Sequence, residues 1–447
     1  MDCFKKDRFQ KIDLQKMNRL KKMDRLEKFI AFIVLFSSVV SLANCGSTGN
    51  FTTTGTTSAG PGSGSSSGGG GGKSIPGYGE GTGASGQTSA VKFLYANPLP
   101  GGGPYAASIG NNGMLTLVQG GSANNLNPHT LAIDPSGSFI FQTAQGFSGG
   151  TQGGIFVYAI NRSNGSLGPA SSSYLTGQAF YSDVVDNQGK FLYVQGASGV
   201  YAFSIQWGTG ALTPVSGSPF PAATPSSPGY SQPATLMVVD QTNQFLYVST
   251  SAGISGYTIN QSTGQLTAIA GSPFGGSTVT DPWTIVITPT NSYLYELQAQ
   301  NAGKLFGYSI DQTSGALTPL SGSPFSTGSC GTMVAPGTIG VPGPDNMTIA
   351  SAGKFMYDNC GIYSIDESNG TIAQVSGSGP GDWPVISPAG DFLWAITGDQ
   401  QACFHCDIGI TSYQVNASTG ALTPVPNSFV LLTNSEVGSV DSLAITK

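Results

Sequence analysis

One histidine and three aspartates occupy the same place in four apolar segments, five residues before the turn that ends each segment: His129, Asp345, Asp382 and Asp441. Aligning further segments by their turns adds Tyr181, Thr235 and Trp283 at this position. Carboxylates and imidazole hold divalent cations or act as acid/base pairs, and aromatic rings stack on sugars. The alternative is that the aspartates cap strand ends and bind water, because Asp is common beside turns.

Four cysteines offer a second possible chemistry: Cys330, Cys360, Cys403 and Cys406. In an exported protein an even set of thiols favours disulfides, and we expect Cys330 to pair with Cys360 and Cys403 with Cys406. The alternative is a metal or redox site, since His405 lies inside the Cys-x-x-Cys motif. A second Cys-x-x-Cys motif is missing, which argues against zinc.

Charge and motifs exclude several classes of function. From Cys45 onward the chain has seven Lys/Arg and eighteen Asp/Glu residues, a net charge of −11. Such an acidic body cannot neutralise phosphates, so we expect no nucleic-acid partner. The sequence has no phosphate-binding Gly-x-x-x-x-Gly-Lys loop, no Gly-x-Ser-x-Gly nucleophile turn and no EF-hand-like loop.

The elements that must position these residues form a sevenfold repeat. A turn of the type Asn-x-x-x-Gly-x-Leu recurs with its glycine at 113, 165, 210, 264, 315, 370 and 420, a spacing of 45 to 55 residues. Between turns, apolar and polar residues alternate as in strands, and such spacing is typical of four-stranded propeller blades. We therefore expect an all-β, seven-bladed β-propeller over residues 91–447, with the seven aligned residues ringing the mouth of its channel.

The two ends of this region complement each other. Residues 442–446 match a first strand, whereas residues 91–95 match a second strand that continues into a third and a fourth. One C-terminal strand and three N-terminal strands would complete one blade and remove the free sheet edges. A ring closed in this way has no need to oligomerise, so we expect a monomer.

The repeat resembles a known family in its turn and strand residues. The segments Asp134-Pro135-Ser136-Gly137-Ser138-Phe139 and Phe245-Leu246-Tyr247-Val248 are similar to the lactonase-type seven-bladed propellers, which include 6-phosphogluconolactonase-like enzymes and YVTN-repeat surface proteins. This resemblance implies a lactone site at the channel mouth built from histidine, arginine and acidic side chains. His129 matches the family histidine. Arg162, the one arginine after residue 45, falls in a turn that should lie on the opposite face, which argues against a phosphosugar substrate.

Residues 1–45 have the features of a targeting segment. Ten basic residues among the first 28 precede the apolar run 29–44, which is short for a membrane-spanning helix and suits a signal peptide. The run ends at Leu42-Ala43-Asn44-Cys45, which resembles a bacterial lipobox and implies lipidation of Cys45; an uncleaved signal anchor is the alternative. Residues 46–90 are rich in Gly, Ser and Thr and predict a flexible spacer. Both alternatives tether the propeller to a membrane of the cell envelope, outside the cytoplasm.

Two functions fit these features. The first is a tethered binding or scaffold protein that holds a small molecule, sugar or protein at the channel mouth, with a divalent cation as a possible cofactor. The second is a lactonase-like hydrolase acting on a neutral or cationic lactone or sugar, with His129 and the aspartates as acid/base groups. The sequence leaves this choice open.

Overall fold

A computed structural model describes residues 92–98, 103–120, 128–144, 153–223, 236–275, 282–298, 304–326, 346–359, 361–376, 379–397, 408–433 and 440–446. These residues belong to one compact unit, Ser85–Lys447. The targeting segment, the spacer, Thr235, Asp345 and all six cysteines lie outside the described residues. No helix in the described ranges is long and apolar enough to cross a membrane.

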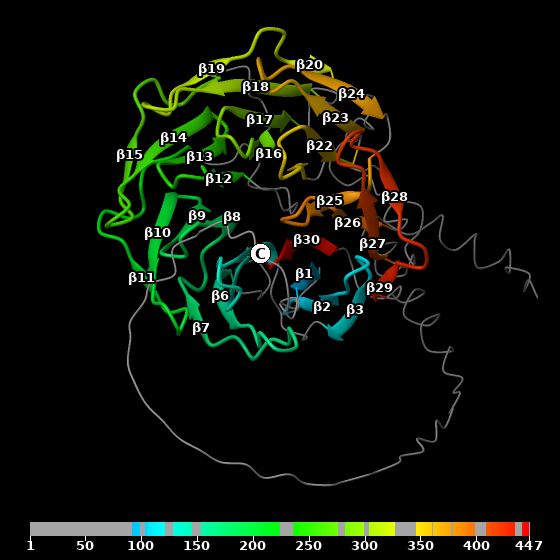
Figure 1. The fold of residues 1–447 in the computed structure, drawn as a ribbon. Helices are drawn as coiled ribbons and strands as arrows, with labels where there is room; N and C mark the ends of the chain where they lie inside the picture. Colours follow the sequence, from blue (N-terminus) through cyan, green and yellow to red (C-terminus); the bar gives the residue numbers. More distant parts are fainter. Residues whose placement is uncertain are drawn as a thin grey trace, which may run out of the picture. The chain divides into compact units, whose positions relative to one another are not determined.

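Seven antiparallel sheets surround a common centre, as the sequence repeat predicted (Figure 1). We number the sheets as blades in chain order and name the strands of each from the innermost outward. Blade 1 contains β4 (Pro128–Ile133), β5 (Phe139–Ala144), β6 (Gly154–Ala159) and β7 (Ser172–Tyr174). Blade 2 contains β8 (Phe180–Val185), β9 (Phe191–Gly196), β10 (Gly199–Ile205) and β11 (Leu212–Pro214). Blade 3 contains β12 (Met237–Val239), β13 (Phe245–Thr250), β14 (Gly253–Ile259) and β15 (Leu266–Ala268).

Two of the remaining blades have a short fifth strand. Blade 4 contains β16 (Pro282–Ile287), β17 (Tyr293–Gln298), β18 (Lys304–Ile310), β19 (Leu317–Pro319) and β20 (Phe325–Ser326). Blade 5 contains β21 (Thr348–Ile349), β22 (Phe355–Asp358), β23 (Gly361–Ile365) and β24 (Ile372–Ser376). Blade 6 contains β25 (Asp382–Ile386), β26 (Phe392–Thr397), β27 (Ile408–Val415), β28 (Leu422–Pro424) and β29 (Val430–Thr433). Because β19 and β20 both pair with β18, and β28 and β29 both pair with β27, each short strand continues an interrupted outer strand.

Blade 7 joins the two ends of the chain, as predicted. Its strands are β30 (Val440–Ile445), β1 (Lys92–Pro98), β2 (Tyr105–Ile109) and β3 (Leu115–Gln119), and β30 pairs with β1 from Leu94↔Ile445 onward. Thr446 Oγ1 accepts a 2.9 Å hydrogen bond from the Phe93 amide. In blade 1 the carboxylate of Asp134 accepts the Phe139 amide in the corresponding turn, at 2.6 Å. The closing blade therefore reproduces the turn between first and second strands without a continuous chain.

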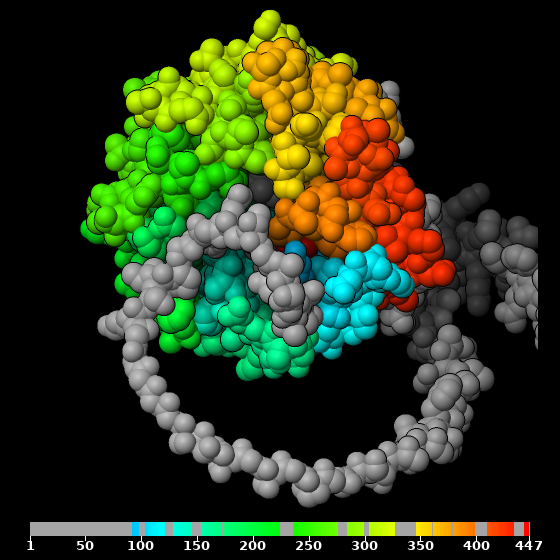
Figure 2. All heavy atoms as spheres, in the orientation of Figure 1, coloured from blue at the N-terminus to red at the C-terminus, as the bar shows by residue number. Residues whose placement is uncertain are grey.

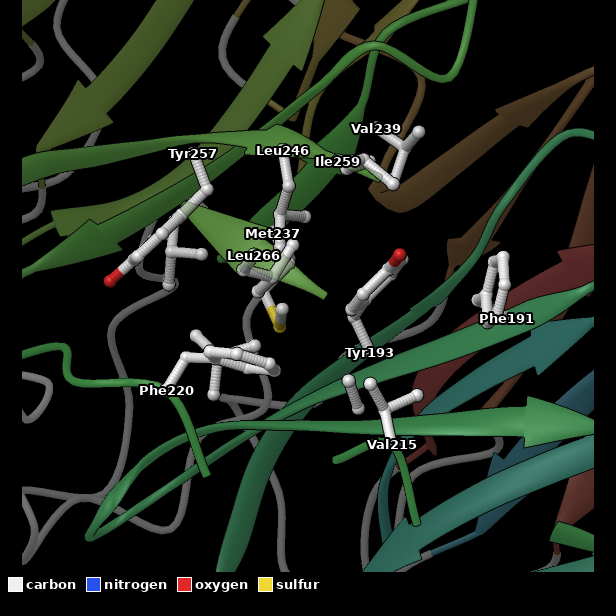
Figure 3. Close-up of a cluster of buried hydrophobic side chains, with 13 residues drawn as sticks. Phe191, Tyr193, Val215, Phe220, Met237, Val239, Leu246, Tyr257, Ile259 and Leu266 are labelled. Carbon is white, nitrogen blue, oxygen red and sulfur yellow. The ribbon is translucent and has the colours of Figure 1, made fainter. Parts of the chain in front are cut away.

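The core lies between neighbouring blades. One buried cluster joins Phe191, Tyr193 and Phe220 of blade 2 to Met237 and Leu246 of blade 3, whose side chains face each other in Figure 3. Similar clusters join other neighbouring pairs, including blades 6 and 7. The blades accordingly pack as adjoining sectors around the ring (Figure 2). The sequence predicted alternating strands, but each sheet is covered on both faces by its neighbours. The second strands β5, β9 and β13 are therefore buried along their whole length and include buried polar residues.

Candidate functional site

The start of each innermost strand and the end of the following strand lie on one face of the propeller, because consecutive strands are antiparallel. We call this the mouth face. His129 lies near the start of β4, and Tyr181 lies at the same position of β8 in the next blade. Their rings are in edge contact, with centroids 6.4 Å apart and planes at 89°. The structure therefore brings these two predicted residues together, with 2% and 8% of their surfaces exposed.

A buried carboxyl group lies beside this pair. Thr130 Oγ1 donates a 2.5 Å hydrogen bond from β4 to Asp183 Oδ1 on β8, and it is also 2.8 Å from Thr143 Oγ1 on β5. The other oxygen, Asp183 Oδ2, is buried and has no hydrogen-bond partner on another described residue. Burial raises the pKa of Asp183 to about 7, against the lowering effect of the Thr130 hydrogen bond. This carboxyl can therefore both accept and donate a proton near neutral pH.

A second buried carboxyl group occurs at the mouth end of blade 4. Glu296 on β17 is fully buried, and Ser249 of blade 3 donates a hydrogen bond to its Oε1. Burial raises the pKa of Glu296 to about 7, while Ser249 and Gln298 act in the lowering direction. Blades 2 and 4 thus each hold a carboxyl group whose charged form is disfavoured by the loss of water.

Other buried polar side chains at this end tie neighbouring blades together. Gln142 of blade 1 donates to Asn97 Oδ1 of blade 7 at 2.6 Å, and Thr284 of blade 4 donates to Asn346 Oδ1, which precedes β21, at 2.9 Å. The Gln195 side-chain amide of blade 2 donates to the Ser249 carbonyl of blade 3 at 3.2 Å. Paired polar groups of this kind help to fix the register between neighbouring blades.

Asp382 has an inter-blade contact of the same type. It is half-buried at the start of β25, and Asn359 Nδ2 from blade 5 donates to its Oδ1 at 3.1 Å. This contact links blade 5 to blade 6. Trp283 and Asp441 lie in β16 and β30, at the positions predicted from the turns, but their side chains are not among those described. Within the described residues no three His, Cys, Asp or Glu side chains gather as metal ligands would.

Sequence reasoning did not single out Asp183 and Glu296 as buried carboxyl groups, although a signal existed. Asp183 lies two residues after Tyr181. Two residues after the aligned position, other blades have apolar residues such as Leu131, Met237 and Ile285. Glu296 stands where the second strands of blades 2 and 3 have Val194 and Val248, although blades 1 and 5 have Gln142 and Asp358 there. An acid at a strand position that most of its siblings fill with apolar residues is a sign of a buried ionisable group.

Comparison with known proteins agrees with this architecture. The family described as "Lactonase, 7-bladed beta-propeller" matches residues 183–335. The match supports a lactonase-type propeller. No curated protein matches this propeller in sequence. The likeness to the solved structures below is a likeness of fold.

Three solved structures illustrate that likeness. The periplasmic gluconolactonase of Pseudomonas aeruginosa is 15% identical, with a TM-score of 0.59, and the match covers 80% of this chain and 99% of that one. A protein proposed to be a 6-phosphogluconolactonase from Bacteroides uniformis is 16% identical, with a TM-score of 0.57 and coverages of 80% and 99%. Its counterpart from Bacteroides fragilis is also 16% identical, with a TM-score of 0.57 and coverages of 81% and 100%.

Proposed function

We propose that this lactonase-type propeller hydrolyses an uncharged sugar lactone at the mouth face, between blades 1 and 2. The observation that carries the proposal is Asp183, a carboxyl group with a pKa of about 7. It lies on β8 and contacts Thr130, the residue after His129 on β4 of the neighbouring blade. A general base is most effective when its pKa lies near the working pH. The family match and the fold of the gluconolactonase relative support the same reaction class.

The proposed reaction needs one proton acceptor and one group that holds the carbonyl oxygen. The Asp183 carboxylate accepts a proton from water as the water oxygen bonds to the lactone carbonyl carbon, and His129 holds the developing oxyanion. The acyl bond to the ring oxygen then breaks, and Asp183 returns the proton to that oxygen. The product is the open hydroxy acid, and no redox step is involved.

The position of Arg162 favours an uncharged substrate. It lies in the turn between β6 and β7, on the face opposite His129, because β4, β5 and β6 alternate in direction. It is the single arginine after residue 45, so the described mouth face has no guanidinium group to pair with a phosphate.

A second candidate function is binding without catalysis. The observation that favours it is the low exposure of the groups, 2% for His129 and 7% for Asp183, together with the use of Thr130 and Asp183 as an inter-blade contact. In that case the buried polar groups shape the rim of a pocket rather than meet the substrate.

One experiment separates the two functions. Hydrolysis of D-glucono-δ-lactone by the full chain is followed by base consumption at fixed pH, and binding of the stable analogue D-glucono-δ-lactam is measured by calorimetry. We expect Asp183→Asn to lower kcat/KM by about 100-fold or more while lactam affinity stays nearly unchanged. Glu296→Gln is the matched control, because it alters an equally buried carboxyl group two blades away, and it should retain activity.

The other outcomes are equally informative. Lactam binding without lactone hydrolysis would assign the binding function and reject catalysis. Equal losses in Asp183→Asn and Glu296→Gln would show that the effect arises from folding, and absence of both binding and hydrolysis would reject both functions for this sugar class.

A further inference from the structure

Two neighbouring turns on the face opposite the mouth carry side chains that the repeat does not require. Arg162 and Trp207 occupy the same position, the second residue of the turn between the third and fourth strands, in blades 1 and 2. The corresponding turns of blades 3 to 6 have Gln261, Gln312, Glu367 and Ala417 there. Two consecutive blades thus carry Arg162 and Trp207 at a turn position where the other blades have small or polar residues.

The glutamines show what this position does for the fold. Gln261 Nε2 donates to the Thr242 carbonyl at 3.1 Å, and Gln312 Nε2 donates to the Asn291 carbonyl at 2.6 Å, so each fastens its turn to the inner turn of its own blade. Trp207 makes no hydrogen bond to a described residue and is 88% exposed. At this exposure the indole contributes little to the core, and its face is accessible to a ligand.

A pocket of about 230 Å³ lies between these turns. Its lining includes Arg162, Trp207, Gly189 and the inner-turn residues Asp134, Ser136 and Ser138. The lining residues come from turns of blades 1 and 2, with Phe139 at the start of β5 and Ile205 at the end of β10. This volume is below the ~300–1,000 Å³ of pockets for larger ligands and suits a single sugar ring.

The charges in the pocket leave the guanidinium group available. The Asp134 carboxylate accepts hydrogen bonds from the amides of Ser136, Ser138 and Phe139, and it also accepts the Ser136 hydroxyl. Arg162 is exposed and has no hydrogen bond or ion pair to a described residue. Asp134 is therefore committed to its own turn, and Arg162 can pair with a carboxylate from a ligand.

We propose that this pocket binds a saccharide that carries a carboxylate, a uronic acid. The Trp207 indole stacks on the apolar face of the pyranose ring, and Arg162 forms a paired hydrogen bond with the carboxylate. The Ser138 hydroxyl, at the pocket wall, is a further partner for the sugar hydroxyls. Because the body of the protein is acidic overall, recognition of an anion depends on this local arginine rather than on long-range attraction.

The test uses the full chain, with α-1,4-trigalacturonic acid as the probe and its methyl ester as the neutral counterpart, and measures binding by calorimetry at low ionic strength. We expect Trp207→Gln and Arg162→Gln, which install the residue of the sibling turns, each to weaken binding of the acid by about tenfold or more, or about 1.4 kcal/mol. The ester has no carboxylate to pair with Arg162, so it should bind more weakly than the acid. Of the two substitutions, only Trp207→Gln should weaken its binding further. Glu367→Gln, at the same turn position in blade 5, is the control and should leave affinity unchanged.

Three results would overturn the proposal. These are the absence of trigalacturonate binding at about 10 mM, equal affinity for the acid and the ester, and affinity unaffected by either substitution. Thermal unfolding of each variant confirms that it is folded, which is expected because both side chains are exposed. Since the pocket lies on the face opposite the mouth, absence of uronic-acid binding there would not bear on lactone hydrolysis at Asp183.

Discussion

Asp183 and Glu296 are buried carboxyl groups whose protonation should influence the stability of the propeller. Each has a pKa of about 7 in the folded chain, against ordinary values of 3.8 and 4.5. Through these two groups the folded state therefore binds more protons than the unfolded state between about pH 4.5 and 7. The titratable groups in the strands around Asp183 are His129, Tyr181 and Tyr193, and burial raises the pKa of both tyrosines.

The pH dependence of unfolding should reveal these two protons. Stability from a group with a raised folded pKa is present below its unfolded pKa and is lost as pH rises through the folded pKa. Each group should thus lower the free energy of unfolding by on the order of 1.4 kcal/mol per pH unit between about pH 4.5 and 7. Asp183→Asn and Glu296→Gln keep the acceptor oxygens for Thr130 and Ser249, so each should flatten this slope in urea titrations of the full chain. A slope identical to that of the unsubstituted protein would contradict the raised pKa values.

These residues also mark the limit of what the sequence could predict about the site. Counting back from the turns placed His129 and Tyr181 together, because the count gives the position of each residue along the innermost strand of its blade. The Thr130 to Asp183 contact depends on which faces of β4 and β8 meet. Register shifts between Pro128 and Leu131, and between Phe180 and Ser182, change that facing at the mouth end. Turn spacing alone contains no signal for such shifts.

At the scale of elements, the second strand of one blade is fastened to the outer turn of the next. Tyr247 donates through its hydroxyl to the Gly315 carbonyl at 2.7 Å, and Tyr295 donates to the Gly370 carbonyl at 2.7 Å. In blade 6 the Trp394 indole N–H donates to the Gly113 carbonyl at 2.8 Å. A Cβ at residue 315 would come within 2.5 Å of the Phe245 ring, and its φ of +73° favours glycine. The repeated aromatic and glycine residues are therefore two halves of one inter-blade contact.

The tyrosines provide an internally controlled prediction. Tyr357 is equivalent to Tyr295, but its buried hydroxyl has no hydrogen-bond partner among the described residues, and burial raises its pKa to about 12. Tyr295→Phe should destabilise the protein by about 1 kcal/mol because the Gly370 carbonyl loses its partner. Tyr357→Phe should be neutral or slightly stabilising, since it removes an unsatisfied polar group. Chemical denaturation of both variants measures the difference, and equal destabilisation would refute the contact.

At the scale of the molecule, the ring is held shut at blade 7 without a covalent link between its first and second strands. The hydrogen bond from Phe93 to Thr446 Oγ1 joins residues 353 apart in the chain. In blade 4 the Tyr293 amide donates to Thr288 Oγ1 at 3.0 Å across only five residues. The same local contact thus closes an ordinary turn in one blade and the whole propeller in the other.

Loss of the closing Phe93–Thr446 contact should accelerate unfolding more than loss of the equivalent Tyr293–Thr288 contact within blade 4. Thr446→Val and Thr288→Val each leave a backbone amide without its acceptor and should cost about 1–3 kcal/mol at equilibrium. Thr446→Val should in addition accelerate unfolding in urea more strongly, because the ring opens where only noncovalent contacts hold it. Stopped-flow unfolding compares the two variants. Equal unfolding rates would mean that the ring does not open first at blade 7.

The ring itself could be predicted from the sequence because its signals are local. Seven turns at blade spacing, apolar second strands and complementary ends specify the number of blades and the closure without knowledge of any long-range contact. The interrupted outer strands were harder to predict. In blade 4, Ser323 Oγ accepts the Gly307 amide at 3.0 Å, so a side chain takes the place of a strand carbonyl. Only the paired third strand reveals that substitution.

The likeness between the closing contact and an ordinary inner turn makes the position of the chain break interchangeable. A short linker with the sequence of Pro135-Ser136-Gly137-Ser138 would span from Thr446 to Phe93, as that segment spans from Asp134 to Phe139 in blade 1. A circular permutant with this linker, and with new ends between any two blades, should keep the seven inter-blade interfaces. The seven blades thus form a closed ring, and the position of the chain ends in that ring should not determine the fold.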